Sequence, residues 1–332
     1  MATTTAAQGA NPGLTSPMQI FYDRVFLERA KIELRHDFGA QTRNVPMNSG
    51  KTVYFTRFTP LAIITSPLSE AANPTAVDMT AATVSAVLAD YGTYTTVGSL
   101  YSMTSIESGL TEHVEVHGQN AGESIDQLIR TTLAATAAAT SASVQFPIGA
   151  TVSVNTLSTI HTTDTLTGAE IRRAVRTLKN NKAQRFDGGL YRGIIGPYTA
   201  YDLFGNSEWL DAHRYTTSDA IERGVVGKLH GVEFVESNNQ YFVVSGGFST
   251  SVTNVANVYA NFIFGKNAYG VVNLGSISAP KVYVKNPGSN STDNPLDQFS
   301  TIGWKMPFAS VILNANWIVA VMTGATDATH AG

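Results

Sequence analysis

Apolar residues at helical spacing form one continuous stripe in the first half of the chain. The stripe consists of Ile106, Leu110, Val114, His117, Ala121, Ile125 and Leu128. Steps of four and three residues keep these side chains on one face of an α-helix, and their eleven-residue repeat predicts a nearly straight helix. The stripe continues through Ile129 and Leu133 to about residue 143. At 1.5 Å per residue, the predicted helix is roughly 50 Å long.

Gly118 and Gly122 lie inside this predicted helix. Each glycine costs about 1 kcal/mol relative to alanine in a helix interior. Two interpretations therefore stay open: one long helix, or two shorter helices separated at Gly118.

The chain before the stripe predicts one helix and one strand pair. Residues 1–14 are rich in Ala, Thr and Gly and predict a flexible arm, and Pro17 begins a helix that Gly39 ends. The expected apolar contacts of this helix are Ile20, Phe21, Phe26 and Leu34. Alternating β-branched and aromatic residues then predict a strand at 51–58 and its partner at 83–97.

Residues 59–80 connect these two strands and contain three prolines. A connection longer than twenty residues is unusual inside a compact domain. We therefore predict an arm that projects from the domain and folds against a neighbouring subunit. An Ω-loop that follows the surface of its own subunit is the alternative.

The second half of the chain predicts mixed α/β structure. Thr167 and Glu170 form a capping-box pattern at the start of a helix that ends at Asn180 and Asn181. A further helix begins at Pro197. A short helix is predicted at 219–223, and strands are predicted at 190–195, 227–236, 257–264, 271–274, 281–284, 299–306 and 309–321.

Composition narrows the classes of protein to consider. The 332 residues include no cysteine, which excludes disulfides, thiolate metal sites and cysteine nucleophiles. Charged residues make up 14%, against roughly 25% in ordinary soluble domains. This shortage of charge predicts that much of the polar exterior contacts other protein, including copies of the chain. Residues 1–14 do not resemble a signal peptide, and residues 308–322 are too short to span a bilayer.

His113 and His117 are the strongest candidate metal ligands, because they lie four residues apart with Glu112 and Glu115 nearby. In the zinc-protease pattern a glutamate directly follows the first histidine, whereas Val114 occupies that position here. No third ligand is evident, so we predict no metal site. The glycines at 188–196 match neither nucleotide-binding fingerprint, and we predict no catalytic residue and no cofactor.

Positive charge is densest on the helix that begins near Thr167. The cluster consists of Arg172, Arg173, Arg176, Lys179, Lys182 and Arg185. Phosphate contact is one interpretation. A solvated helix face, or pairing with carboxylates of an adjacent subunit, is preferred because no aromatic residues alternate with the cations and the net charge is −3.

Four segments resemble the major capsid proteins of N-four-like tailed phages, which have the Hong Kong 97-type fold. They are LSEAANP at 68–74, ADYGTY at 89–94, GVVGKLHGVEFVE at 224–236, and GWK at 303–305 leading into 309–321. Their order matches the family over nearly the whole chain. One departure is Ala71, where the family usually has glycine after the glutamate at position 70.

The resemblance implies an α+β capsid fold with an N-terminal arm, an extended β-hairpin loop, a long spine helix, and peripheral and axial domains. The implied divisions are 1–48 for the N-terminal arm and helix, 49–100 for the hairpin loop, 101–160 for the spine and peripheral strands, 161–250 for the axial domain, and 251–332 for the closing strands and tail. The candidate subunit contacts are Arg57, Leu68, Glu70, Asn73, Arg172 and Arg176. Gly118 and Gly122 are the candidate points where the spine bends differently in hexamers and pentamers.

The function implied is a non-enzymatic structural protein that self-assembles into the icosahedral shell around double-stranded DNA. Its implied location is the virion, after assembly in the bacterial cytoplasm, and the further partners implied are scaffold, portal and decoration proteins. A bacterial nanocompartment shell is the alternative within the same fold. A hydrolase or nucleotide-binding enzyme and a secreted adhesin are the alternatives from other classes.

Overall fold

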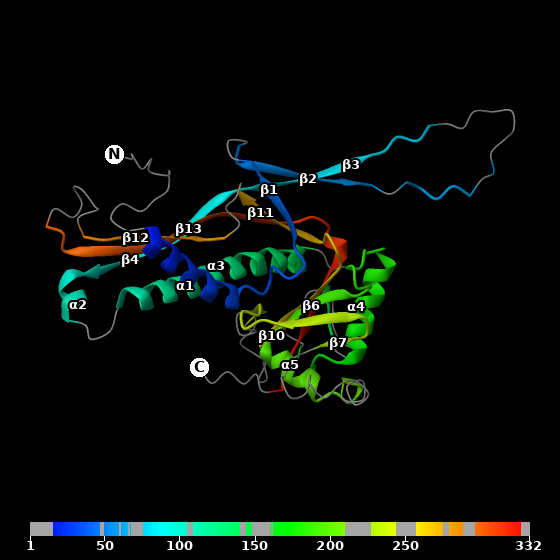
Figure 1. The fold of residues 1–332 in the computed structure, drawn as a ribbon. Coiled ribbons are helices and arrows are strands. Elements are labelled where there is room, and N and C mark those ends of the chain that lie inside the picture. Colours follow the sequence, from blue (N-terminus) through cyan, green and yellow to red (C-terminus); the bar gives the residue numbers. More distant parts are fainter. Residues whose placement is uncertain are drawn as a thin grey trace, which may run out of the picture.

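The computed structural model describes most of the chain and shows an elongated molecule with a projecting hairpin (Figure 1). The described residues are 16–46, 50–59, 61–65, 67, 76–104, 109–139, 144–147, 160, 162–209, 227–243, 257–274, 279–287 and 296–326. None of the helices in these ranges is long and apolar enough to cross a membrane.

The predicted long helix is α3, Gly109–Ala139, and it runs without a break through both glycines. Its stripe is buried as predicted: Val114, Ala121 and Ile125 are all at most 5% exposed. The interpretation with two helices separated at Gly118 is therefore wrong. Ile106 lies outside the described residues, and the short helix α2, Ser99–Thr104, precedes that segment.

Helix α1, Ser16–Glu33, lies along α3 (Figure 1). It buries Tyr22, Phe26 and Ala30, whose spacing of four gives one face. The predicted contacts Ile20 and Phe21 are instead 66% and 52% exposed. The helix also ends earlier than predicted, at residue 33 and not near 38.

A five-stranded sheet covers one side of the α1–α3 pair. It contains β1, Gln41–Val45; β4, Ala89–Gly98; β11, Tyr269–Leu274; β12, Lys281–Lys285; and β13, Phe299–Ile312. The long strand β13 pairs with β4 along 299–308, with β12 along 301–305 and with β11 along 309–312. The two strands predicted at 299–306 and 309–321 are therefore divided differently, because β13 continues through Pro307 to Ile312.

A seven-stranded sheet forms the centre of the second region. It contains β5, Val144–Gln145; β6, Tyr191–Ile195; β7, Lys228–Leu229; β8, Val232–Glu236; β9, Phe242–Val243; β10, Val258–Phe264; and β14, Ile318–Thr323. The short 3-10 helix Ala315–Trp317 leads into β14. Residues 227–236, predicted as one strand, form the β7–β8 hairpin, whose turn residues His230 and Gly231 have φ of 48° and 84°.

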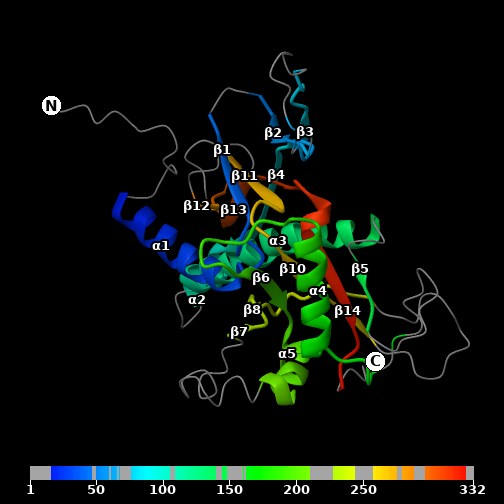
Figure 2. The same cartoon turned by 90° about the vertical axis from the view of Figure 1, so that its right-hand side faces the viewer.

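Both faces of this second sheet are buried. Successive side chains of β10 and β14 point to opposite faces, and every residue of both strands is buried. Phe262 and Phe264 belong to the core shared with α1 and α3, whereas Ile263 and Val319 belong to the core under α4 and α5. Helix α4 is Gly168–Asn180 and α5 is Pro197–Phe204. Figure 2 shows α4 standing against this sheet.

The third sheet is the two-stranded hairpin of β2, Thr52–Phe58, and β3, Ala81–Val87. The returning strand, predicted as 83–97, is divided at Leu88: β3 stays with β2, while β4 enters the five-stranded sheet. The helix predicted at 219–223 lies outside the described residues.

Candidate functional site

The feature that departs most from a compact domain is the hairpin formed by β2, β3 and the described residues between them, 59, 61–65, 67 and 76–80, and we call it the arm. Figure 1 shows it extending well beyond the rest of the molecule. Its strands pair in register from Thr52–Val87 to Phe58–Ala81, and Thr59 N–H extends the pairing by donating to Thr80 O at 2.9 Å. The prediction that this segment projects is confirmed and the Ω-loop alternative is wrong, whereas its contact with a neighbouring subunit stays a prediction.

The base of the arm is fixed to the five-stranded sheet by a small apolar core. Val53, Phe55 and Ala86 from the hairpin are buried against Val272 and Ala309. The Arg43 guanidinium lies 5.5 Å from the centroid of the Phe55 ring, an arrangement that adds a cation–π attraction. The arm therefore has a firm attachment, although few of its side chains are buried.

Apolar side chains along the rest of the arm face solvent. The large ones, at 54–80% exposed, are Tyr54, Phe58, Leu61, Ile63, Ile64, Val77, Met79 and Val87. Contiguous exposed apolar surface is uncommon in monomeric proteins and marks interaction sites. The arm is therefore the strongest candidate contact surface of the described chain.

The predicted contact residues are distributed over separate regions. Arg57 lies on β2, exposed and opposite Ala82. Leu68, Glu70 and Asn73 fall outside the described residues.

The remaining two predicted contacts, Arg172 and Arg176, are exposed on α4, in a different region from the arm. Arg172 already has a partner within the chain, because its Nη1 lies 2.6 Å from Glu208 Oε2. The predicted capping box at the start of α4 is not formed as expected: Thr167 is the N-cap but makes no side-chain capping bond.

Gly118 packs directly against the backbone of α1. A Cβ added there would lie 2.7 Å from the Phe26 carbonyl oxygen, which is too close for any side chain. Gly122 is also buried, and it lines a cavity of about 310 Å³ together with Leu27, Ala30 and Ile125. The packing of α1 is therefore a sufficient reason for Gly118, and bending of the spine at these glycines stays a prediction.

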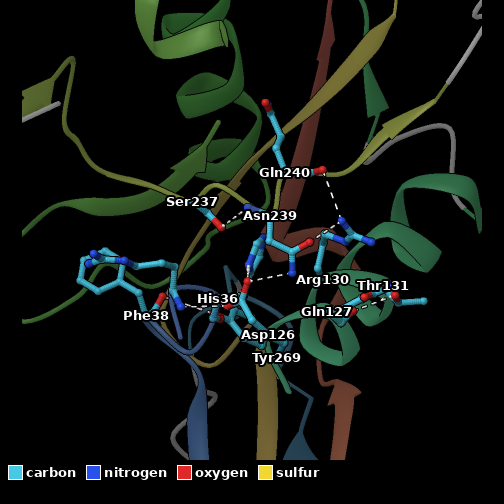
Figure 3. A network of polar contacts seen from close by, with 11 residues as sticks. His36, Phe38, Asp126, Gln127, Arg130, Thr131, Ser237, Asn239, Gln240 and Tyr269 are labelled. Carbon is cyan, nitrogen blue, oxygen red and sulfur yellow. Dashed lines mark hydrogen bonds and ion pairs between the residues drawn. The ribbon is translucent and has the colours of Figure 1, made fainter. Parts of the chain in front are cut away.

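A buried polar network ties the spine to both neighbouring regions (Figure 3). Asp126 on α3 is fully buried; its Oδ1 accepts from the N–H groups of Arg35 and His36 at 2.8 and 2.6 Å, and its Oδ2 lies 2.7 Å from His36 Nδ1. Asn239, after β8, donates to the same carboxylate at 3.2 Å, and Arg130 donates to Asn239 at 2.6 Å.

Burial and hydrogen bonding have opposite effects on the pKa of the Asp126 carboxyl. Burial alone would raise its pKa, but the hydrogen bonds and charge of His36 and the N–H of Arg35 outweigh burial and hold the pKa below its usual value. Tyr269 is also buried, which raises the pKa of its hydroxyl, and this hydroxyl donates to His36 O at 2.6 Å. The hydrogen bonds to Asp126 hold the segment after α1 and the segment after β8 on one carboxylate of α3.

Of the two candidate histidines, His117 is used in packing. His117 is 4% exposed, and its Nε2 lies 2.8 Å from Thr95 Oγ1 on β4. Burial, together with the nearby His113, lowers the pKa of His117 and favours the neutral ring. Within the described ranges, no group of three or more metal-ligating side chains comes together.

The network around Asp126 was not predicted from the sequence. A signal was present, because Asp126 directly follows Ile125 and precedes Ile129 by three residues on the buried side of the predicted helix. A carboxylate among buried positions requires a partner. The partners, His36 and Asn239, are about ninety and more than a hundred residues away, so spacing alone did not identify them.

Comparison with known protein families gives no match, and comparison with curated protein sequences gives none either. Solved structures do match. The capsid of Ralstonia phage GP4 superposes with a TM-score of 0.67 at 11% identity, over 98% of this chain and 99% of that one. The cyanophage Pam1 capsid gives 0.65 at 17% identity over 98% of both chains, and the cyanophage P-SCSP1u capsid gives 0.62 at 16% over 86% of both. The chain has the Hong Kong 97-like fold of phage capsid proteins, as its sequence motifs predicted.

Proposed function

We propose that this chain is a phage major capsid protein that assembles into hexamers and pentamers of an icosahedral shell around double-stranded DNA. The observation that carries the proposal is the arm, which places a row of apolar side chains in solvent on a segment attached firmly at its base. The capsid fold supports the same conclusion. A neighbouring copy is the surface that would bury these side chains.

Assembly of this kind requires no catalysis. Many modest contacts per subunit become strong together, because each bound copy raises the effective concentration of the next contact. The arm would lie across the adjacent subunit, with Arg57, Leu68, Glu70 and Asn73 at the contact. The spine α3 would brace the peripheral region, and Gly118 and Gly122 would be its bending points.

The proposal includes the division of the chain into five parts at 1–48, 49–100, 101–160, 161–250 and 251–332. It also places the assembled protein in the virion, after assembly in the host cytoplasm. Scaffold, portal and decoration proteins complete the proposed set of partners, by resemblance to the phage capsid class. The finer resemblance to N-four-like phages belongs to this proposal as well.

Negative-stain microscopy of the expressed protein, with and without a co-expressed scaffold, tests the function. We expect shells, rings or capsomers. A protein that stays monomeric under all these conditions contradicts the proposal, and shells that enclose an enzyme in place of DNA favour a nanocompartment.

A further inference from the structure

Three cations follow one exposed face of α4, and we call Arg172, Arg176 and Lys179 the α4 stripe. Their spacing of four and three residues places them on the side opposite Ile171, Ala174 and Leu178, which are fully buried. Like charges at this spacing repel each other along a helix. A stripe of this kind is therefore most stable when an anion covers it.

The stripe borders a hollow of about 390 Å³ between α4 and the β7–β8 turn. The residues that line it are Arg172, Val175, Arg176, Lys179, Asn180 and His230. Among these described lining residues there is no acid, and the polar groups include four cationic or protonatable side chains. The hollow is therefore suited to an anion.

Two of the lining residues, Arg172 and His230, already contact a carboxylate that is not part of the lining. The Glu208 carboxylate lies 2.6 Å from Arg172 Nη1 and 2.9 Å from His230 Nε2. The first residue of α4 makes room for it, because a Cβ on Gly168 would lie 2.0 Å from Glu208 Oε2. In contrast, no ion pair joins Arg176 or Lys179 to a carboxylate within the part of the chain that the structure describes.

The chemistry of this face differs from that of the arm. The large exposed apolar side chains of the described chain do not include any residue of α4. Protein interfaces concentrate aromatic and apolar residues at their centre, whereas contacts to nucleic-acid phosphates rely on Arg and Lys. The α4 stripe therefore matches a phosphate backbone better than a second protein surface.

We infer that the α4 stripe binds the phosphate backbone of double-stranded DNA, with Arg176 and Lys179 supplying charges that are not paired with a carboxylate among the described residues. Arg172 shares its charge with Glu208 and fixes the edge of the site. This inference replaces the solvated face or subunit contact that the sequence favoured for these cations. The net charge of −3 supported that earlier interpretation, but it is a total over the whole chain, whereas the stripe is a local concentration of positive charge. The choice of DNA as the source of the phosphates rests on the proposed function.

Titration of the unassembled full-length protein with a short random-sequence DNA duplex, at several salt concentrations, tests the inference. The variant is Arg176→Ala with Lys179→Ala. We expect weaker binding and a salt dependence whose logarithmic slope is smaller by about two, since each phosphate contact contributes roughly 0.9. The matched control is Lys31→Ala with Lys285→Ala, which removes two exposed cations elsewhere and should bind as the wild type does.

Arg176→Lys with Lys179→Arg keeps the charge and should restore binding, and circular dichroism should confirm that all variants fold. Equal binding by the variant and the control overturns the inference. It is also overturned if inorganic phosphate binds and the duplex does not, or if the variant loses assembly while it keeps DNA binding. Because this titration uses unassembled protein, it fails separately from the test of shell formation.

Discussion

The arm and the spine are both rich in apolar residues, but they place these residues in opposite environments. On the spine α3, Val114, Ile129 and Leu133 are at most 1% exposed, whereas on the arm Ile63 and Ile64 are each 80% exposed. Burying a side chain of this size contributes about 1.5–3 kcal/mol of stabilising free energy relative to leaving it in water. The spine obtains this stabilisation within one subunit, and the arm can obtain it only from another molecule.

This difference separates two kinds of stability. Substitutions on the spine should change the free energy of unfolding of the isolated subunit. Substitutions on the arm should leave that free energy almost unchanged and should alter association. Substitutions and a pH profile test this separation, and the largest effect on the isolated subunit is expected at Asp126.

Asp126→Ala should destabilise the subunit most, by about 3–5 kcal/mol, because it leaves buried partners of a charged network without their acceptor. The partners are the N–H groups of Arg35 and His36 and the amide of Asn239. Denaturant unfolding of the unassembled protein measures the change. The control is Asp187→Ala, which removes an exposed pair with Lys266 and should change the free energy of unfolding far less. Equal losses would show that the network adds no stability.

Leu133→Ala should cost about 2–5 kcal/mol, since it creates a cavity under a fully buried spine position. Val116→Ala is the matched control, because Val116 lies on the same helix and is 67% exposed. We expect a change below about 0.5 kcal/mol for the control. Similar losses at the two positions would contradict the burial pattern of the spine.

Acid should weaken the subunit partly through Asp126. The folded-state pKa of this carboxyl is depressed, so its contribution is present above the unfolded pKa of about 3.9 and is lost as pH falls through the folded value. Stability measured from pH 7 downward should therefore fall below about pH 4. Asp126→Asn should show a shallower fall, and an unchanged profile would exclude Asp126 as a source of the acid sensitivity.

Gly118→Ala should destabilise the subunit by about 1–3 kcal/mol, because the new Cβ would lie 2.7 Å from the Phe26 carbonyl oxygen. This loss should exceed the gain of about 1 kcal/mol that alanine brings in a helix interior. Gly98→Ala serves as the control, since a Cβ there has no neighbour within 4 Å. Thermal unfolding of both variants measures the two changes in stability. A stabilised Gly118→Ala protein would contradict the packing role of Gly118.

The sequence predicted the elements whose signal is local. The stripe of α3, the strand β2 and the strand β10 follow from spacing or alternation, and both the arm and the fold class were predicted correctly. Helix α1 was predicted too long because its end depends on a distant residue: the N–H groups of Arg35 and His36 bond to Asp126 instead of to a helical carbonyl.

The predicted boundaries of two strands were wrong for a similar reason. Leu88 marks the place where the chain leaves β2 as a partner and joins β13, and Pro307 lies between the β12 and β11 partners of β13. Neither change of partner has a local signature beyond the proline. The exposure of Ile20 and Phe21 was missed because α1 carries apolar residues on more than one face.

The central claim is that the apolar side chains of the arm hold one subunit to the next. The most direct test is assembly of Ile63→Ser with Ile64→Ser, followed by sedimentation and negative-stain microscopy. The matched control is Leu100→Ser with Leu296→Ser, which removes two leucines that are 74% and 75% exposed outside the arm. We predict that the arm variant unfolds within about 0.5 kcal/mol of the wild type but does not form shells, while the control assembles. Normal shells from the arm variant would contradict the account.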